Sequence, residues 1–247
     1  LGRVETSLPG GCRIGKRPVD LHIRGLTELG AVVRIEDNRI RAEAPPAGLL
    51  GAEIHLPYPS VGATENILMA AAGAMGETVL AGAAREPEIG ILCSFLKAMG
   101  VSVEGAGSSV IRVRGTGSFR DSCFSLPGDR IVAGTYLGAV LCAGGHVLLE
   151  QAPAEHMGKT LWTAKQMGAQ LEPVEEGLWV SMQRRPGPVD IETGPYPEFP
   201  TDMQSVVMAA AALADGTSCI RENVFENRFC VAKELQKLGA HIIIEDK

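Results

Sequence analysis

A motif recurs four times along the chain, and this repeat limits the fold more than any other feature. Each copy is a helix-like run ending in Leu or Met, then a glycine, then a run rich in β-branched residues. The glycines stand 70, 68 and 71 residues apart, at Gly30, Gly100, Gly168 and Gly239. Glycine takes the left-handed conformation that ends a helix at little cost, and β-branched residues favour the strand that follows. The repeat therefore predicts an α/β protein of similar units.

A second sequence pattern recurs at nearly the same spacing as the first. Runs of small residues end at a glycine before a strand, at Gly76, Gly145 and Gly216. Further strands are expected at residues 39–42 and 110–113. The helices expected at residues 63–74, 134–143 and 203–214 are nearly all small or apolar, which is typical of helices buried on most sides. Such units must pack around one another, and two units per lobe place a boundary near Pro127 and Gly128.

Composition excludes several classes of function. The 247 residues carry a formal net charge of −6, which argues against general binding of nucleic acid. The apolar runs are too short to cross a membrane, and no signal segment is recognised at the start. The glycines form no Walker or dinucleotide motif, so no cofactor is expected. The six cysteines form no CxxC pair, which favours reduced thiols in the cytoplasm and argues against a zinc or other metal site.

The chemistry is expected where the repeat is broken, first at residues 8–20. Cys12 lies there among glycines and prolines, and three cations follow it within five residues. Nearby cations stabilise a thiolate and suit a phosphate or carboxylate. The stretch is read as a mobile loop with a reactive cysteine beside an anion site, or as a surface turn with an incidental cysteine. Pro18 fits the first turn of a helix, with Asp20 favourable near its positive end.

Two strand-to-helix junctions also break the repeat. In the first, Ser60 is interpreted as a helix cap. The functional alternative, compatible with the cap, is that its hydroxyl and nearby N–H groups hold a ligand phosphate. In the second, Thr201 is a plausible cap. Asp202 beside it is either a first-turn acid serving the helix dipole or a carboxylate that acts as a base in a cleft.

A fourth unrepeated stretch is polar and covers residues 224–229. Arg228 and Glu226 lie so close in sequence that a pair between them is favoured over a role with substrate. The five histidines show neither metal spacing nor a triad, and no chemistry is assigned to them.

Five stretches carry a resemblance to a known family. They are Leu8-Pro9-Gly10-Gly11-Cys12-x-Ile14-Gly15-x-Arg17-Pro18-Val19-Asp20-Leu21-His22, Ser60-Val61-Gly62-Ala63-Thr64, Ala84-Arg85-Glu86-Pro87-Glu88-Ile89, Phe199-Pro200-Thr201-Asp202-Met203-Gln204 and Val224-Phe225-Glu226-Asn227-Arg228-Phe229. In this order they resemble the UDP-N-acetylglucosamine 1-carboxyvinyltransferase family of enolpyruvyl transferases, over essentially the whole chain.

The resemblance implies a fold of six βαβαββ units in two lobes, the inside-out α/β barrel of enolpyruvyl transferases. About four units are expected in this chain. Residues 1–126 would be most of the catalytic-loop lobe and residues 127–247 part of the second lobe. The first and last units of the family pattern, with its catalytic lysine and asparagine, have no counterpart here. This polypeptide alone is therefore expected to turn over little substrate, and to expose apolar surface that favours self-association.

The resemblance also implies the reaction and its residues. The family transfers the enolpyruvyl group of phosphoenolpyruvate to the 3′-hydroxyl of UDP-N-acetylglucosamine, the first committed step of peptidoglycan synthesis. Cys12 resembles the acid that protonates the methylene carbon, and Asp202 resembles the base that takes the hydroxyl proton. The nucleotide-sugar contacts would be Arg17, Pro18, Val19, Asp20, Leu21, Tyr58, Pro59, Ser60, Val61 and Val224. The family often has a basic residue where this chain has Tyr58.

Two alternatives stay open at this point. One is the sister transferase that acts on shikimate 3-phosphate, which shares the repeat and lacks the cysteine loop. The other is a fragment that binds a nucleotide sugar without catalysis.

Overall fold

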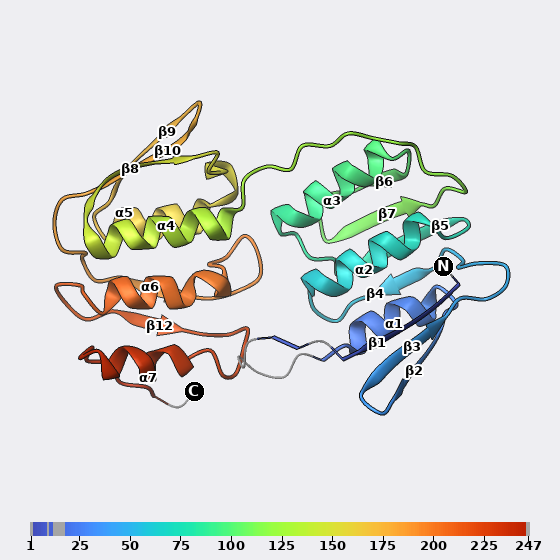
Figure 1. Cartoon of the computed structure of the whole chain (residues 1–247), viewed down its shortest axis with the longest axis horizontal. Helices are drawn as coiled ribbons and strands as arrows, with labels where there is room; N and C mark the ends of the chain where they lie inside the picture. The colour runs from blue at the N-terminus through green and yellow to red at the C-terminus, as the bar shows by residue number, and fades with distance from the viewer. Residues whose placement is uncertain (1, 9, 12–17, 246–247) are drawn as a thin grey trace. The chain divides into compact units, whose positions relative to one another are not determined.

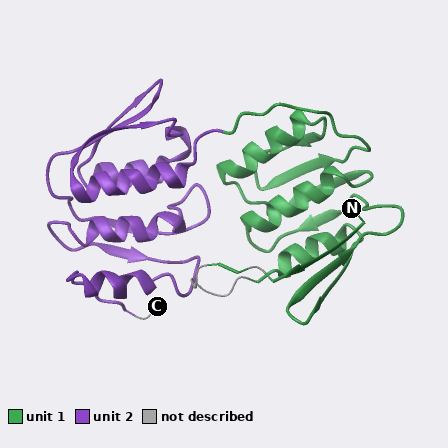
Figure 2. Ribbon diagram, in the orientation of Figure 1, with its two compact units in different colours: residues 1–11, 17–126 green, residues 12–16, 127–247 purple. Residues whose placement is uncertain are grey.

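The computed structural model describes residues 2–8, 10–11 and 18–245, and these fall into two compact units. The first unit ends at Leu126 and the second begins at Pro127 (Figure 2). Each unit has its own hydrophobic core, and the two cores share no residue. Cys12 and Arg17, which the sequence places in the opening loop, lie outside the described residues.

The described part of the first unit has three helices and two sheets. Figure 1 labels these elements. Strands β1, β2 and β3 form one sheet in the order β1-β3-β2, and strands β4 to β7 form the other in the order β4-β5-β7-β6. The elements are β1 (Arg3–Ser7), α1 (Asp20–Glu28), β2 (Val32–Glu36), β3 (Arg39–Glu43), β4 (Glu53–His55), α2 (Val61–Ala72), β5 (Glu77–Ala81), α3 (Pro87–Ala98), β6 (Ser102–Glu104) and β7 (Val110–Arg114).

The second unit has four α-helices, two short 3₁₀ turns and two sheets in its described part. One sheet has the order β8-β10-β9, and the other pairs β11 with β12 in parallel. The elements are α4 (Arg130–Ala143), β8 (Gly145–Glu150), η1 (Ala154–His156), α5 (Gly158–Gln166), β9 (Gln170–Val174), β10 (Gly177–Met182), β11 (Asp190–Glu192), η2 (Thr201–Met203), α6 (Gln204–Ala211), β12 (Cys219–Arg221) and α7 (Cys230–Lys237).

The repeat expected from the sequence is confirmed by the connectivity. Elements β4-α2-β5-α3-β6-β7 form one complete βαβαββ unit, in which β4 and β5 are parallel and the other neighbours are antiparallel. The sheet β8-β10-β9 reproduces the antiparallel part of that unit, and β11 with β12 reproduces the parallel part. The sheet β1-β3-β2 is a third antiparallel copy.

The four repeat glycines end their helices in the same way. Gly30, Gly100, Gly168 and Gly239 have φ between 93° and 106°, the left-handed region that a side chain disfavours. Each glycine N–H donates to the carbonyl three residues back, and the following N–H donates to the carbonyl five residues back. These are the two bonds of the Schellman motif. The glycine therefore sets the end of each helix and, in the first three copies, the direction of the next strand. The strand expected after Gly239 is absent from the described residues.

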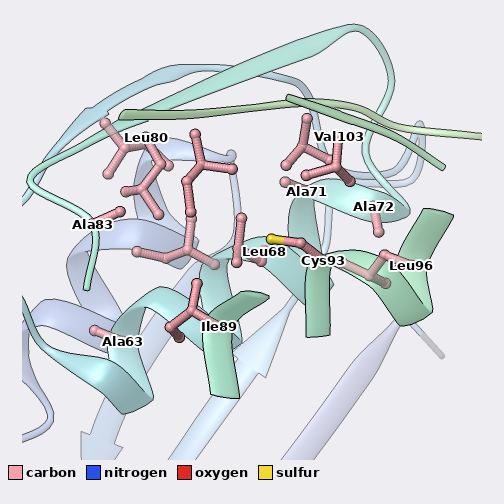
Figure 3. Packing of buried hydrophobic residues seen from close by; sticks show 14 of the residues in the cluster. Ala63, Leu68, Ala71, Ala72, Leu80, Ala83, Ile89, Cys93, Leu96 and Val103 are labelled. Atoms are coloured by element: carbon pink, nitrogen blue, oxygen red, sulfur yellow. The ribbon is translucent and has the colours of Figure 1, made fainter. Parts of the chain in front are cut away.

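Small residues let the helices of the first unit approach closely. Ala63, Ala71 and Ala72 of α2 are buried against larger side chains such as Leu68 and Ile89 (Figure 3). Burying a side chain of that larger kind contributes about 1.5–3 kcal/mol. The core therefore fixes the helix spacing, and with it the positions of the loops at the helix starts.

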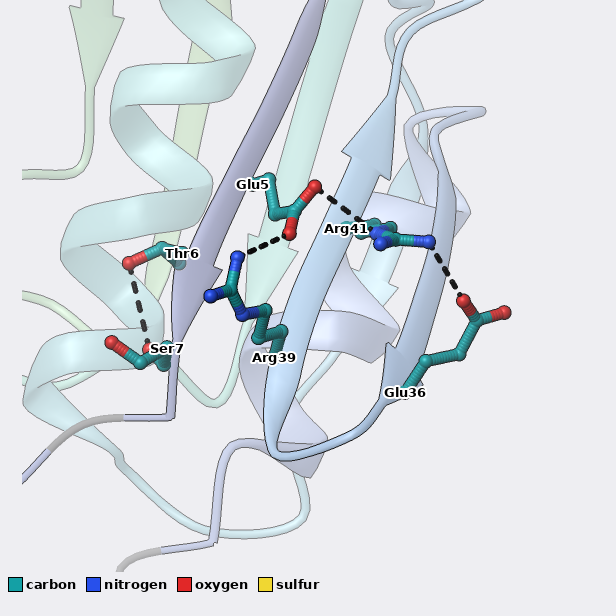
Figure 4. A network of polar contacts seen from close by, with 6 residues as sticks. All are labelled: Glu5, Thr6, Ser7, Glu36, Arg39 and Arg41. Carbon is teal, nitrogen blue, oxygen red and sulfur yellow. Dashed lines mark hydrogen bonds and ion pairs between the residues drawn. The ribbon is translucent and has the colours of Figure 1, made fainter.

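Charged side chains line the exposed face of the sheet β1-β3-β2. Glu5 of β1 accepts from Arg39 at 2.8 Å and from Arg41 at 3.1 Å, and Arg41 also reaches Glu36 at 3.0 Å (Figure 4). The hydrogen bond from Arg39 is the main reason that the pKa of Glu5 lies below its ordinary value. Such exposed pairs stabilise little, so their effect is to favour one register for β1, which leads into the opening stretch.

Candidate active site

The described residues after the opening stretch form the start of helix α1. Val19 is the N-cap and Asp20 is the first helical residue, with its carboxylate favourable in the first turn. The expectation that Pro18 lies in that turn is wrong, because the non-helical backbone of Val19 (φ −103°, ψ 10°) separates Pro18 from the helix. Leu21 is buried in the core of the first unit, so only its backbone is available to a ligand.

The second predicted segment lies at the start of helix α2. The Ala63 N–H donates to Ser60 Oγ at 3.4 Å, and Ser60 has the extended backbone of an N-cap, which confirms its capping role. Tyr58 and Pro59 precede it and are exposed, and Val61 is half-buried as the first residue of the helix. The segment can therefore present both side chains and backbone to a ligand.

His22 joins these two segments within the first unit. Its Nδ1 lies 2.6 Å from Nδ2 of Asn66 in α2, an amide that donates to the neutral ring. A Cβ on Gly62 would lie 3.2 Å from Cε1 of His22, so the ring rests on the glycine. Burial lowers the pKa of His22, opposed by the charge of Asp20. Sequence reasoning missed this contact, since no spacing links residues 22 and 66.

In the second unit, Asp202 pairs with an arginine from another element. Arg228 Nη2 donates to Asp202 Oδ1 at 2.7 Å. The arginine side chain is only 12% exposed, while that of Asp202 is 57% exposed. The favoured pairing of Arg228 with its near neighbour Glu226 is therefore wrong, because the fold brings the guanidinium to η2 instead. The guanidinium therefore fixes the position of the Asp202 carboxylate, which stays exposed to a ligand.

Glu222 connects the elements that carry Asp202 and Val224. Thr201 Oγ1 donates to the Glu222 carboxylate at 3.0 Å, and the N–H groups of Val224 and Phe225 donate to Glu222 Oε1 at 2.9 and 3.0 Å. The expectation that Thr201 caps a helix is wrong, because its hydroxyl makes this long-range bond and no side chain caps η2. Sequence reasoning missed Glu222, whose only signal is an acidic residue directly after a predicted strand.

The loop at Val224 is held from both sides. The Asn223 side chain donates to Glu192 Oε1 at 2.8 Å and to the Thr193 carbonyl at 3.1 Å. Because the Val224 N–H is already paired with Glu222, a ligand at Val224 would meet its carbonyl or side chain. The predicted sites thus form two clusters, residues 18–21 with 58–61 in the first unit and Asp202 with Val224 in the second.

Cation binding finds no support in the described part of the chain. No three His, Cys, Asp or Glu residues there are placed to hold a metal ion, and its five cysteines are free. None of the helices described is long and apolar enough to cross a membrane.

Comparison with known sequences identifies relatives along the whole chain. The sequence model of the EPSP synthase family (3-phosphoshikimate 1-carboxyvinyltransferase) matches residues 1–247. The UDP-N-acetylglucosamine 1-carboxyvinyltransferase of Maricaulis maris is 49% identical over 245 residues, and that of Anaeromyxobacter sp. strain Fw109-5 is 46% identical over 246 residues. These matches cover 98% and 100% of this chain but only 58% of each relative, so the chain spans little more than half of their length.

Solved structures with little sequence identity share the fold. The enolpyruvyl transferase NikO from Streptomyces tendae matches with a TM-score of 0.83 at 21% identity, over 99% of this chain and 58% of that one. An EPSP synthase from Acinetobacter baumannii matches with a TM-score of 0.59 at 22% identity, over 87% of this chain and 51% of that one. The fold expected from the sequence is thereby confirmed.

Proposed function

The chain belongs to the EPSP synthase (3-phosphoshikimate 1-carboxyvinyltransferase) family, and on that premise we propose that its protein transfers the enolpyruvyl group of phosphoenolpyruvate to the 3′-hydroxyl of UDP-N-acetylglucosamine. The observation that carries the choice of acceptor is the 46–49% identity, over nearly every residue of this chain, to relatives that bear that enzyme's name. The reaction would begin peptidoglycan synthesis.

The proposed reaction has two stages that balance. In the first, the sugar hydroxyl adds to C2 of phosphoenolpyruvate, Asp202 accepts the hydroxyl proton, and the Cys12 thiol donates a proton to C3. In the second, the C3 methyl group gives a proton back to the Cys12 thiolate, the double bond reforms, and phosphate leaves from C2 with the proton that Asp202 had accepted. An enol phosphate is attacked at C2 only as C3 is protonated, so an acid and a base are both required. No metal or cofactor is needed.

Both clusters of predicted site residues would bind the nucleotide sugar. The nucleotide sugar would contact residues 18–21 and 58–61 with Arg17, and it would also contact Asp202 and Val224. The helix starts at Asp20 and Val61 offer backbone N–H groups that favour phosphate oxygens. Residues 1–126 would then belong to the lobe that carries Cys12, and residues 127–247 to the second lobe. A cytoplasmic location fits an acid that must remain a reduced thiol.

The test is release of inorganic phosphate by the intact protein that carries this sequence. Phosphate should appear only when both substrates are present. Asp202→Asn and Cys12→Ala should each abolish most of the release. The matched controls are Asp37→Asn at the β2–β3 turn and Cys123→Ala, since Asp37 and Cys123 are exposed and outside the clusters. Equal losses in the controls would refute the assigned roles.

The same assay separates the alternatives. Phosphate released with shikimate 3-phosphate and not with the nucleotide sugar would favour the activity that gives the family its name. Binding of UDP-N-acetylglucosamine with no release of phosphate from phosphoenolpyruvate in the presence of either acceptor would favour a non-catalytic binding protein.

A further inference from the structure

Two chains of contacts, called arms below, connect the carboxylate of Glu222 to Asp202. Glu222 follows strand β12 directly and accepts hydrogen bonds from two separate segments, the turn η2 and residues 224–225. Resting on the proposed function, we propose that Glu222 is a positioning residue for enolpyruvyl transfer: it does not touch substrate but fixes Asp202 and the Val224 backbone in one geometry.

The first arm runs through Thr201. Thr201 Oγ1 lies 3.0 Å from both carboxylate oxygens of Glu222, and Thr201 immediately precedes Asp202 in η2. This turn is three residues long, and no side chain caps it. A short 3₁₀ turn has poor internal hydrogen bonds, so an outside tether at its first residue decides where the Asp202 side chain points.

The second arm runs through Phe225 and Arg228. The Phe225 N–H donates to Glu222 at 3.0 Å, and the guanidinium of Arg228 lies 5.5 Å from the centre of the Phe225 ring. Arg228 then donates to Asp202 at 2.7 Å. Glu222 therefore reaches Asp202 by two routes, and both close on the same carboxylate.

The charge of Glu222 suits this role. A carboxylate accepts through two oxygens and can satisfy the Thr201 hydroxyl and two backbone N–H groups at once. Hydrogen bonds to an ionised acceptor are roughly twice as strong as those between neutral groups. A glutamine at this position has one acceptor oxygen, and its amide would face the hydroxyl with a donor, so the Thr201 arm would be reversed or lost.

The test uses kinetics of the intact protein with phosphoenolpyruvate and UDP-N-acetylglucosamine. Thr201→Val removes the hydroxyl with little change in shape, and kcat is expected to fall roughly 10- to 100-fold, because small displacements of a reacting group cost that much. The KM for phosphoenolpyruvate should change by no more than about threefold, since the change acts on the base. Thr201→Ser keeps the hydroxyl and should restore kcat to within about twofold.

A double variant and a stability control complete the test. Thr201→Val combined with Glu222→Gln should lower kcat by less than the product of the two single effects, because the two residues share one hydrogen bond. Ser218→Ala removes a different bond of the same unit, from the Val189 N–H to Ser218 Oγ at 3.0 Å, and should lower stability without lowering kcat.

The outcomes distinguish failure of the proposed function from failure of the positioning role of Glu222. A wild-type protein that releases no phosphate would refute the proposed function, and the inference with it. An active wild type with unchanged kcat in Thr201→Val, or an equal fall of kcat in Ser218→Ala, would refute the positioning role alone. Strictly additive losses in the double variant would also refute it.

Discussion

The close approach of helices α1 and α2 gives a prediction whose size follows from the structure. A Cβ built on Gly25 of α1 would lie 2.3 Å from Cγ1 and 2.4 Å from Cδ1 of Ile67 in α2. Carbon atoms in contact are normally about 3.5–4.0 Å apart. Ile67 is fully buried, so it has no open space to move into. Gly25→Ala must therefore displace one helix or strain the side chain.

The matched variant is Gly90→Ala in helix α3 of the same unit, where a new Cβ would meet nothing within 4 Å. Both changes gain about 0.8–1.0 kcal/mol of helix propensity. Overpacking a core costs about 1–3 kcal/mol, and only Gly25→Ala incurs that cost. Gly90→Ala should thus stabilise by up to about 1 kcal/mol, while Gly25→Ala should be less stable than it by about 1–3 kcal/mol.

Urea unfolding followed by far-ultraviolet circular dichroism measures the difference. Both tryptophans, Trp162 and Trp179, lie in the second unit, so fluorescence reports that unit separately and should be unchanged by either variant. In an Ile67→Ala background the clash is gone, and Gly25→Ala should stabilise as Gly90→Ala does. Equal stabilities of the two single variants would refute the reasoning about the α1–α2 contact.

Three further predictions concern buried or half-buried polar groups. Neither side-chain polar atom of the fully buried Gln204 makes a hydrogen bond in the described structure. Gln204→Met should therefore raise the free energy of unfolding, measured by urea unfolding, by about 1–3 kcal/mol. A lower free energy of unfolding would show that the amide has a partner. Burial lowers the pKa of His22, so the folded state resists protonation of the ring and the free energy of unfolding should fall as pH drops below about 6.5. His22→Gln should lose this part of the pH dependence. An unchanged dependence of stability on pH in that variant would contradict the prediction. Burial, and then the charges of Glu88 and Glu86, raise the pKa of Glu65. Glu65→Gln should therefore raise the melting temperature at neutral pH, and this gain should vanish below about pH 4.3, where the carboxyl is protonated in both the folded and the unfolded state. A gain in melting temperature that persists in acid would contradict this explanation.

Local signals in the sequence were sufficient for the repeat and for the helix ends. Gly30 and its three counterparts indicate helix ends, because the left-handed backbone conformation there costs glycine little energy. Ser60 reports a cap that needs no partner beyond its own helix. Both are determined by residues a few positions away, so they can be read from spacing.

Contacts between distant segments could not be predicted in this way. Arg228 pairs with Asp202, 26 residues away, rather than with Glu226. Thr201 bonds to Glu222, 21 residues away, rather than capping a turn. Each outcome depends on how β11 and β12 bring their loops together, and a local rule assigns the nearer partner. The sequence therefore identified Asp202 as a candidate base but not the residues that hold it.

The choice of acceptor, a nucleotide sugar in the proposed function, can be measured by competition between two acceptors. The direct measurement offers the intact protein phosphoenolpyruvate together with equal amounts of UDP-N-acetylglucosamine and shikimate 3-phosphate, and identifies the enolpyruvyl product by mass spectrometry. The expected product is the enolpyruvyl ether of UDP-N-acetylglucosamine, formed in proportion to the phosphate released and absent in Asp202→Asn. Formation of the shikimate product in its place would contradict the proposed function.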